Sequence, residues 1–241
     1  MNMRLDKFFT SVGSLSRSET QRAVRAKRIF VNGAAAKKAD VKIDPENDVI
    51  TLDGEQVLYR EFTYIMLNKP QGYISATDDS RLPTVMELLP EKYGKLGLFP
   101  CGRLDRDTTG LMLLTDDGEL AHFLLSPVSH VPKTYYFECR EELCEVSAKK
   151  LTDGVDIGEK SITKPAALEY EGKSGKITIS EGRYHQIKRM FETVGNEITY
   201  LERVTFGPLT LDPSLARGEW RELSEKEIKE IQKHNRNIKE N

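Results

Sequence analysis

Positive charge is concentrated at one end of this 241-residue chain. Residues 1–42 contain ten Lys and Arg against three Asp and Glu, a formal charge of +7, whereas the whole chain carries −2, so the remainder carries −9. A basic head on an acidic body is typical of two separate modules, and the length allows one or two domains of about 150 residues. We therefore expect two domains, 1–60 and 61–241.

The overall composition is that of a globular chain. Hydrophobic residues make up 38% and charged residues 31%, which argues against disorder. No apolar run approaches the roughly 18 residues of a membrane span, and the N-terminus lacks the apolar stretch of a secretory signal. We therefore expect a cytoplasmic protein without a membrane partner. The three cysteines lack CxxC spacing, which argues against a disulfide framework or a zinc ribbon and predicts buried free thiols.

The basic head predicts two helices and a small sheet. Apolar residues recur with helical spacing over residues 5–12, and Gly13 would end that helix. Ser16 and Glu19 form a capping-box pair ahead of a second helix, whose outer surface is cationic. Short strands with tight turns between them are predicted at 29–31, 49–52 and 56–58.

Five cations lie within residues 17–28 beside a single acid. They would repel one another unless a phosphate backbone neutralised them, although a solvated basic helix is the alternative. The pattern RLDKFF…SRSE…VRAKRIFVNG resembles the S4 RNA-binding domain over the first 60 or so residues. The resemblance implies a grip on structured RNA, with phosphate contacts from Arg4, Lys7, Arg17, Arg22, Arg25 and Arg28.

Beyond residue 60, short strands and helices are interleaved without the regular alternation of a parallel α/β fold, which indicates the α+β class. Strands are predicted at 62–67, 96–99, 111–114, 135–138, 176–179, 198–201 and 209–211. Helices are predicted near 119–125, 144–151, 186–194 and 225–234.

The densest group of chemically active side chains is GRLDRDTTG, residues 102–110, just before an apolar run. Its acids partly match a calcium loop, but the last position of that template holds Asp rather than Glu and the apolar run is a predicted strand. We therefore expect no metal. Phosphate-binding glycine loops and the serine-esterase elbow are also absent from the sequence, so we expect no nucleotide cofactor.

A second group is EGRYHQIKRMF, residues 181–191. On the helix predicted there, Lys188 lies on the flank of the apolar face and can turn toward a semi-buried pocket. Arg189 projects from the opposite side, toward solvent or phosphate. His185 has no partner at metal-ligand spacing, and a satisfied histidine at a helix start is the simpler interpretation.

Four blocks carry a second resemblance: MLNKPQGYISATDD, GRLDRDTTGLMLLTDDGELAH, VPKTYY and ISEGRYHQIKRMF. They resemble, in residues and spacing, the signature blocks of the RsuA/RluB-type pseudouridine synthases, and with the S4 head the match covers almost the whole chain. The resemblance implies an S4-type α/β domain followed by a catalytic domain with a mixed, mainly antiparallel sheet.

The same resemblance implies isomerisation of uridine to pseudouridine, without a cofactor, most closely in the RsuA branch that modifies small-subunit (16S) ribosomal RNA. The partner would be ribosomal RNA or a small-subunit assembly intermediate, and we expect a monomer. A large-subunit RNA target and a non-catalytic rRNA-binding or assembly factor remain alternative interpretations.

Pseudouridine formation requires an ionised carboxylate near the sugar, as a nucleophile or as a base that passes through a glycal. The resemblance assigns this role to Asp105, although the sequence alone would not exclude Asp107. It assigns the neighbouring cation to Lys188 and the aromatic residue that packs on the uracil to Tyr135, with Tyr136 as a competitor. Contacts to the flanking RNA and the flipped nucleotide are expected from Arg103, Arg183, His185, Gln186 and Arg189.

Overall fold

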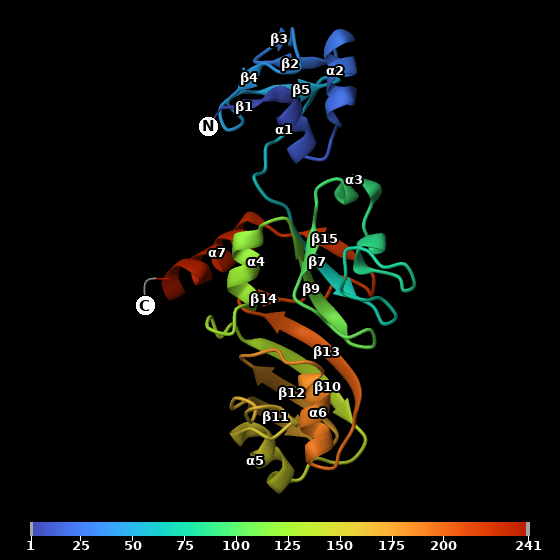
Figure 1. Cartoon of the computed structure of the whole chain (residues 1–241), viewed down its shortest axis with the longest axis vertical. Helices are drawn as coiled ribbons and strands as arrows, with labels where there is room; N and C mark the ends of the chain where they lie inside the picture. Colours follow the sequence, from blue (N-terminus) through green and yellow to red (C-terminus); the bar gives the residue numbers. More distant parts are fainter. Residues whose placement is uncertain (1, 240–241) are drawn as a thin grey trace. The chain divides into compact units, whose positions relative to one another are not determined.

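The computed structural model describes residues 2–239, with side chains as far as residue 233, and the chain separates into two units (Figure 1). The first unit contains the residues up to Thr63 and also the segment Leu89–Leu98. The second unit contains Tyr64–Leu88 and the chain from Phe99 onward. The chain thus leaves the first unit close to residue 60 and returns to it once.

In the first unit, two helices pack on short antiparallel strands. Helix α1 (Leu5–Ser11) ends before Gly13, and α2 (Arg17–Arg25) begins with the predicted capping box. The Ser16 hydroxyl accepts from the backbone N–H of Glu19, whose carboxylate accepts from the N–H of Ser16. The strand pairs are β1 (Met3–Arg4) with β4 (Lys42–Ile43), and β3 (Ala34–Ala35), β2 (Ile29–Val31), β5 (Ile50–Leu52) and β6 (Glu55–Gln56) in that order. The returning segment carries the short helix α3 (Glu91–Gly94).

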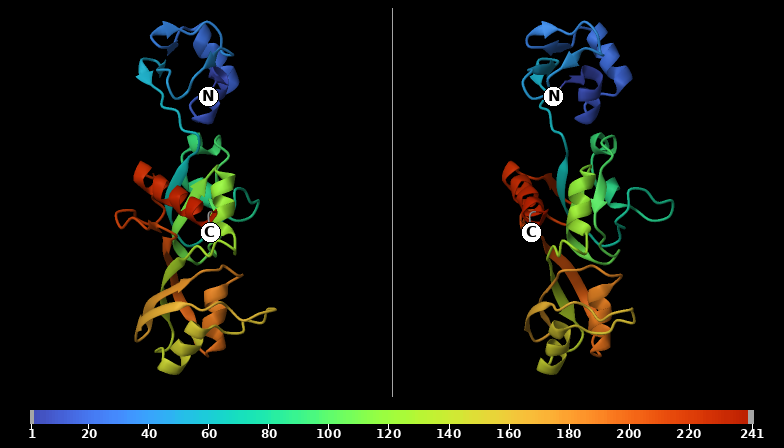
Figure 2. Two further views of the ribbon diagram at one scale, coloured as in Figure 1. Left: turned by 90° about the vertical axis from the view of Figure 1, so that its left-hand side faces the viewer. Right: turned by 60° about the vertical axis from the view of Figure 1, so that its left-hand side comes forward.

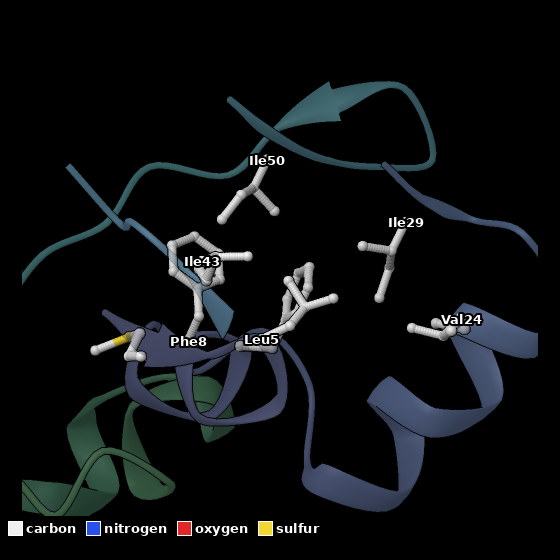
Figure 3. Close-up of a cluster of buried hydrophobic side chains, with 9 residues drawn as sticks. Leu5, Phe8, Val24, Ile29, Ile43 and Ile50 are labelled. Atoms are coloured by element: carbon white, nitrogen blue, oxygen red, sulfur yellow. The ribbon is translucent and has the colours of Figure 1, made fainter. Parts of the chain in front are cut away.

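The core of the first unit is formed by the apolar faces of both helices and of four strands. Figure 3 shows their side chains pointing toward one another. Burial of this apolar face leaves the charged residues of the helices outside, because a helix of this length can bury only one stripe. All six predicted phosphate contacts of this unit are exposed: Arg4, Lys7, Arg17, Arg22, Arg25 and Arg28.

The second unit is built on a nine-stranded mixed sheet. Its pairs are antiparallel except between β13 and β9, where Arg203 lies beside Gly110 in parallel register. The strands along the main path are β11 (Ala167–Glu171), β12 (Ser174–Ile179), β10 (Lys133–Cys139), β13 (Ile198–Phe206), β9 (Thr109–Thr115), β7 (Tyr64–Lys69) and β15 (Trp220–Glu222). Strand β8 (Phe99–Cys101) pairs with β9, and β14 (Leu209–Thr210) pairs with β13. The predicted α+β class with a mixed, mainly antiparallel sheet is confirmed.

Helices cover parts of this sheet (Figures 1 and 2). Helices α4 (Gly118–Leu125) and α7 (Glu225–Lys239) lie side by side and contact each other. Helix α6 (Gln186–Thr193) packs on β10 through the rings of Phe191 and Phe137, whose centroids are 4.8 Å apart. Helix α5 (Glu145–Asp153) contacts β11, and a 3-10 turn, η1, spans Val85–Leu88. None of the described helices is long and apolar enough to cross a bilayer.

Three expectations from the sequence differ from the structure. The strand predicted at 96–99 begins only at Phe99, because Gly97 has a φ of +70° and turns the chain there. Strands β11 and β15 were not predicted, since their residues are largely exposed or half-buried and lack a clear apolar alternation. Cys101 and Cys139 are buried free thiols, but Cys144 is exposed at the start of α5.

Candidate active site

The loop that carries Asp105 connects β8 to β9, and a buried lysine donates hydrogen bonds to its backbone. Lys69 Nζ, at the end of β7, donates to the carbonyl oxygens of Asp105 (3.0 Å), Thr108 (2.8 Å) and Pro70 (3.1 Å). The Lys69 side chain is fully buried, and burial lowers its pKa to about 8, while the charges of Asp107 and Asp105 act in the opposite direction. Lys69 therefore fixes the backbone of the loop rather than acting on its carboxylates.

Gly110 closes the same loop where β9 meets β13. Its φ is +98°, and a Cβ atom at this position would lie 2.4 Å from the carbonyl oxygen of Arg203. A side chain is excluded both by the backbone conformation and by the close approach of the neighbouring strand. This contact sets the distance between the loop and β13.

The carboxylate of Asp105 lies between two side chains of the second group. Lys188 Nζ is 3.1 Å from Asp105 Oδ2 and 2.5 Å from Asp107 Oδ1, and His185 Nε2 is 3.5 Å from Asp105 Oδ1. Burial disfavours the charged form of Lys188, but the hydrogen bonds with Asp107 and Asp105 outweigh it and raise its pKa. Burial likewise opposes the charged form of Asp107, yet the hydrogen bond from Lys188 lowers its pKa. Lys188 therefore stays cationic at neutral pH and lies within ion-pair distance of both carboxylates.

These residues open into a cleft of about 570 Å³ within the second unit. Asp105, Lys188, His185 and Arg103 line it together with Tyr135. Asp107 is not among the lining residues, and 69% of its side chain is exposed. The Asp105 side chain is 27% exposed, so it is reachable from the cleft yet partly shielded from water.

Tyr135 and Tyr136 occupy opposite faces of β10, as consecutive residues of a strand must. Tyr135 is buried and lines the cleft. Tyr136 is half-buried on the other face and donates to Glu138 Oε1 at 3.1 Å. Of the two candidate aromatic residues, Tyr135 is therefore the one that the structure brings to the cleft with Asp105.

Several predicted RNA contacts of the second group are engaged within the protein. Arg183 donates to the carbonyl oxygens of Ser161 (2.6 Å) and Ile162 (2.8 Å), and Gln186 Nε2 donates to Glu181 Oε1 at 2.8 Å. Arg189 was expected to project toward solvent or phosphate. It instead pairs with Glu159 at 2.6 Å and donates to the carbonyl oxygens of Tyr184 (3.0 Å) and Ile157, with a quarter of its side chain exposed.

His185 begins α6 in a left-handed conformation, with φ +48° and ψ +34°. This region is uncommon for residues other than glycine and signals a local constraint. The ring of Tyr184, which is 72% exposed, stacks on the His185 ring with centroids 3.8 Å apart. The strained turn thus holds the imidazole beside Asp105.

The cations of the first unit fall into two sets. Arg4 pairs with Asp6 at 2.7 Å and Arg28 with Asp53 at 2.5 Å. In the described part of the chain, no hydrogen bond or ion pair engages the side chains of Lys7, Arg17, Arg22 and Arg25.

No group of three or more His, Cys, Asp or Glu within the described residues is arranged to hold a metal ion. The sequence interpretation missed Lys69, which it treated as part of a loop signal. The signal available was a lysine at the end of an unbroken buried strand, YIMLNK, where a charged residue is rare without a specific partner.

Comparisons with known proteins identify the family. The model of the RNA pseudouridylate synthase family matches residues 63–193, and that of the S4 domain matches residues 3–50. "Uncharacterized RNA pseudouridine synthase YtzG" of Bacillus subtilis is 47% identical over 94% of this chain and 97% of its own length. "Ribosomal small subunit pseudouridine synthase A" of Escherichia coli is 44% identical over 95% of this chain and 100% of its own length.

A solved structure agrees with these relatives. It is described as "Crystal structure of pseudouridylate synthase", is 40% identical to this chain and has a TM-score of 0.68, covering 95% of this chain and 99% of its own. The Asp105–Lys188 pair thus lies within the region that the synthase family model matches. The chain belongs to the RNA pseudouridylate synthase family and carries an S4 domain at its N-terminal end.

Proposed function

We propose that this protein converts a uridine of small-subunit ribosomal RNA to pseudouridine, acting as a monomer in the cytoplasm. One observation carries the chemistry: a partly shielded Asp105 carboxylate opens into the cleft with Lys188 Nζ at 3.1 Å. The choice of RNA rests on the "Ribosomal small subunit pseudouridine synthase A" relatives of Escherichia coli and Yersinia pestis, which are 44% and 45% identical over nearly the whole chain.

Asp105 is proposed to act on the ribose of the target uridine. The reaction breaks the bond from C1′ to N1 of uracil, turns the base and forms a bond from C1′ to C5. Asp105 either attacks C1′ as a nucleophile or removes the C2′ proton to give a glycal, and in both cases it must be charged. Lys188 favours that charge, because an opposite charge at this distance stabilises the ionised carboxylate.

One observation supports Asp105 over Asp107 and Tyr135 over Tyr136. Asp105 and Tyr135 both line the cleft, whereas Asp107 and Tyr136 do not. A uracil ring inserted next to Tyr135 would rest against its aromatic face with the sugar directed toward Asp105. Tyr135 is therefore proposed to pack on the base and to take part in moving its protons.

The RNA is proposed to be held by two groups of residues. Lys7, Arg17, Arg22 and Arg25 contact phosphates from the S4 domain. Arg28 joins them once RNA competes with its exposed partner Asp53, and Arg4, whose guanidinium is exposed although its partner Asp6 is buried, contacts phosphate through its remaining donors. Arg103 and His185 meet the flipped nucleotide at the cleft. Arg183, Gln186 and Arg189 are proposed to contact RNA at the edge of the cleft, through N–H groups that are not used in hydrogen bonds within the protein.

The test is pseudouridine mapping on ribosomal RNA, in a strain that lacks the protein and in vitro with the purified enzyme. Restoring wild-type protein should restore one modified position in small-subunit RNA, and Asp105→Asn should restore none while binding the RNA with similar affinity. Asp107→Asn is the matched control and should keep most of the activity.

Three outcomes would contradict the proposal. A modified position in large-subunit RNA would show that the target is large-subunit RNA. A pseudouridine map that is the same with and without the protein would indicate a non-catalytic RNA-binding factor. Full activity of Asp105→Asn would remove the proposed carboxylate. Whether naked RNA or an assembly intermediate is the substrate follows from comparing the two as substrates in vitro.

A further inference from the structure

Two buried cations lie beside Tyr135 on the face of the sheet that forms the cleft. Lys133 precedes Tyr135 by two residues on β10, so both side chains are on the same, buried face of that strand. Arg203 on β13 is the direct cross-strand partner of Tyr135, and directly opposed residues share a face. We call Lys133 and Arg203 the buried cation pair.

Within the described residues, no carboxylate forms an ion pair with either member of the buried cation pair. Lys133 Nζ donates to the carbonyl oxygen of Val131 at 3.0 Å, and Arg203 Nε donates to that of Leu111 at 2.7 Å. Both cations also lie over the ring of Phe206, at 5.4 Å and 4.8 Å from its centroid. Lys188, by contrast, has two carboxylates within 3.1 Å.

An arrangement of this kind is costly unless an anion arrives. Lys133 is 9% exposed and Arg203 is 1% exposed, and burying a charge without an opposite charge is unfavourable. Burial, with the charge of Arg203, lowers the pKa of Lys133 to about 8. Among the described residues, the hydrogen-bond acceptors of the two side chains are backbone carbonyl oxygens and the Met112 sulfur, 3.9 Å from Arg203 Nη2. Neutral donors could serve these acceptors, so the two charges call for an anionic ligand.

The surroundings select the kind of anion. Both members of the buried cation pair line the same cleft as Asp105, and the neighbouring wall includes the buried side chains of Ile179 and Leu201. A flat, partly apolar wall suits a planar base. A phosphate keeps its hydration more easily at the exposed rim, where Arg103 lies.

We propose that the buried cation pair binds the uracil ring and stabilises the negative charge that it carries while detached from the sugar. This inference rests on the proposed function. When the C1′–N1 bond breaks, its electron pair leaves with the base, and the charge spreads over N1 and the two carbonyl oxygens. The sugar is compensated either by an ester bond from Asp105 to C1′ or by loss of the C2′ proton to Asp105.

The charge is consumed when the base rejoins the sugar. C5 supplies the electron pair of the new C5–C1′ bond, either as the ester bond between C1′ and Asp105 breaks or as Asp105 returns its proton to C2′ of the glycal. C5 then loses its own proton, and N1 gains one. The reaction is an isomerisation without redox change. The buried cation pair therefore needs to be complementary only to the detached uracil anion, which exists between bond cleavage and bond formation.

The first test measures binding of free bases and needs no RNA. At pH 7.5, 5-nitrouracil is an anion whereas uracil is neutral, and calorimetric titration compares their affinities for the full-length protein. Wild type should prefer 5-nitrouracil by about tenfold or more, and Lys133→Met should lose that preference. Lys176→Met, which replaces an exposed lysine on β12 outside the cleft, should retain it.

Equal affinity of the wild type for both bases would overturn the proposal, and so would an undiminished preference in Lys133→Met. The wild-type comparison does not depend on any variant folding. It is also independent of which RNA is modified, so an error in the proposed target and an error in this inference produce different results.

The second test separates an electrostatic role from a structural one. Lys133→Met should lower the single-turnover rate on the target uridine by about 100-fold, leave the KM for RNA nearly unchanged, and melt no lower than wild type, because an apolar replacement of a buried charge is often tolerated. A 5-fluorouridine at the target position yields a more stable uracil anion, so its C1′–N1 cleavage should be slowed less. Equal loss on both substrates would reject the electrostatic role.

Discussion

The exposed cations of α2 and the buried or partly buried cations of the second unit carry the same charge in opposite settings. Arg17, Arg22 and Arg25 project from α2 into solvent without a partner among the described residues. Lys69 and Lys188 in the second unit are each held by several oxygen atoms at known distances. Exposed charges act together over about 10 Å and are screened by salt, whereas buried charges act on single atoms. We therefore expect that substituting one cation of α2 has a small effect on RNA affinity, whereas substituting one cation of the second unit has a large effect on the rate or the stability.

The largest effect is expected for Lys188. Lys188→Met removes the cation that is shared by Asp105 and Asp107, so neither carboxylate keeps the opposite charge beside it. The single-turnover rate should fall by about 10³-fold, while RNA affinity changes little. Lys188→Arg should recover part of the rate. A Lys188→Met rate within threefold of wild type would contradict this comparison, because the loss of one charge in the second unit would then have as small an effect as the loss of one charge on α2.

The stability of a Lys69 variant tests how much a buried cation contributes to the free energy of unfolding. Lys69→Met leaves the carbonyl oxygens of Asp105 and Thr108 without their donor, and we expect a loss of about 3 kcal/mol in the free energy of unfolding. The matched control is Lys173→Met, because exposed Lys173 also donates to a carbonyl oxygen, that of Arg140, at 2.8 Å. The control should cost less than about 0.5 kcal/mol. Equal losses in urea unfolding would contradict the comparison.

The pH dependence tests the charge of Lys133. Its pKa of about 8 lies below the ordinary 10.5, so Lys133 loses its proton in the folded protein as pH rises through 8. Between these values the unfolded chain binds more protons, and the free energy of unfolding should rise with pH. Activity should instead fall above pH 8. The charged neighbour is Arg203, and Cys101, with a pKa raised by burial to about 12, stays neutral in this range.

The measurement is the single-turnover rate between pH 7 and 10, together with urea unfolding over the same range. Lys133→Arg keeps the charge and should move the fall in activity to higher pH. Any fall near pH 8 that remains in this variant belongs to Lys69, whose pKa is also about 8. A rate that does not change between pH 7 and 9 in wild type would contradict a role for the Lys133 charge.

The smallest effects are expected on α2. Changing Arg17, Arg22 or Arg25 to Gln should each reduce the slope of log affinity against log salt by about 0.7 to 0.9 and leave the maximal rate unchanged. Arg28→Gln provides the contrast, because Arg28 already pairs with Asp53 and its loss should alter the slope less. If all of these variants bind RNA like wild type at every salt concentration, the charge on the N-terminal unit has no role in RNA binding.

Much of this arrangement could be predicted from the sequence. The capping box of α2, the helix at α6 and the cleft position of Asp105, Tyr135 and Lys188 follow from residue order, because each depends on neighbours within a few positions or on blocks that resemble a family. The strand at 96–99 was displaced because a glycine with positive φ interrupts it. The engaged state of Arg183 and Arg189 was missed, because partners such as Ser161 and Glu159 lie 22 and 30 positions away and no local pattern reveals them.

By itself, the sequence determined the division into a basic head and an acidic body and the class of the fold, because charge and local periodicity are properties of the chain alone. The residues proposed to carry the chemistry came from its resemblance to a family. Only the tertiary structure decided which of these charges are alone and which are neutralised. Lys133, Arg203 and Lys69 come from three strands that are distant in the sequence. Their burial, and hence the strength of their charges, arises when the sheet brings those strands together and excludes water.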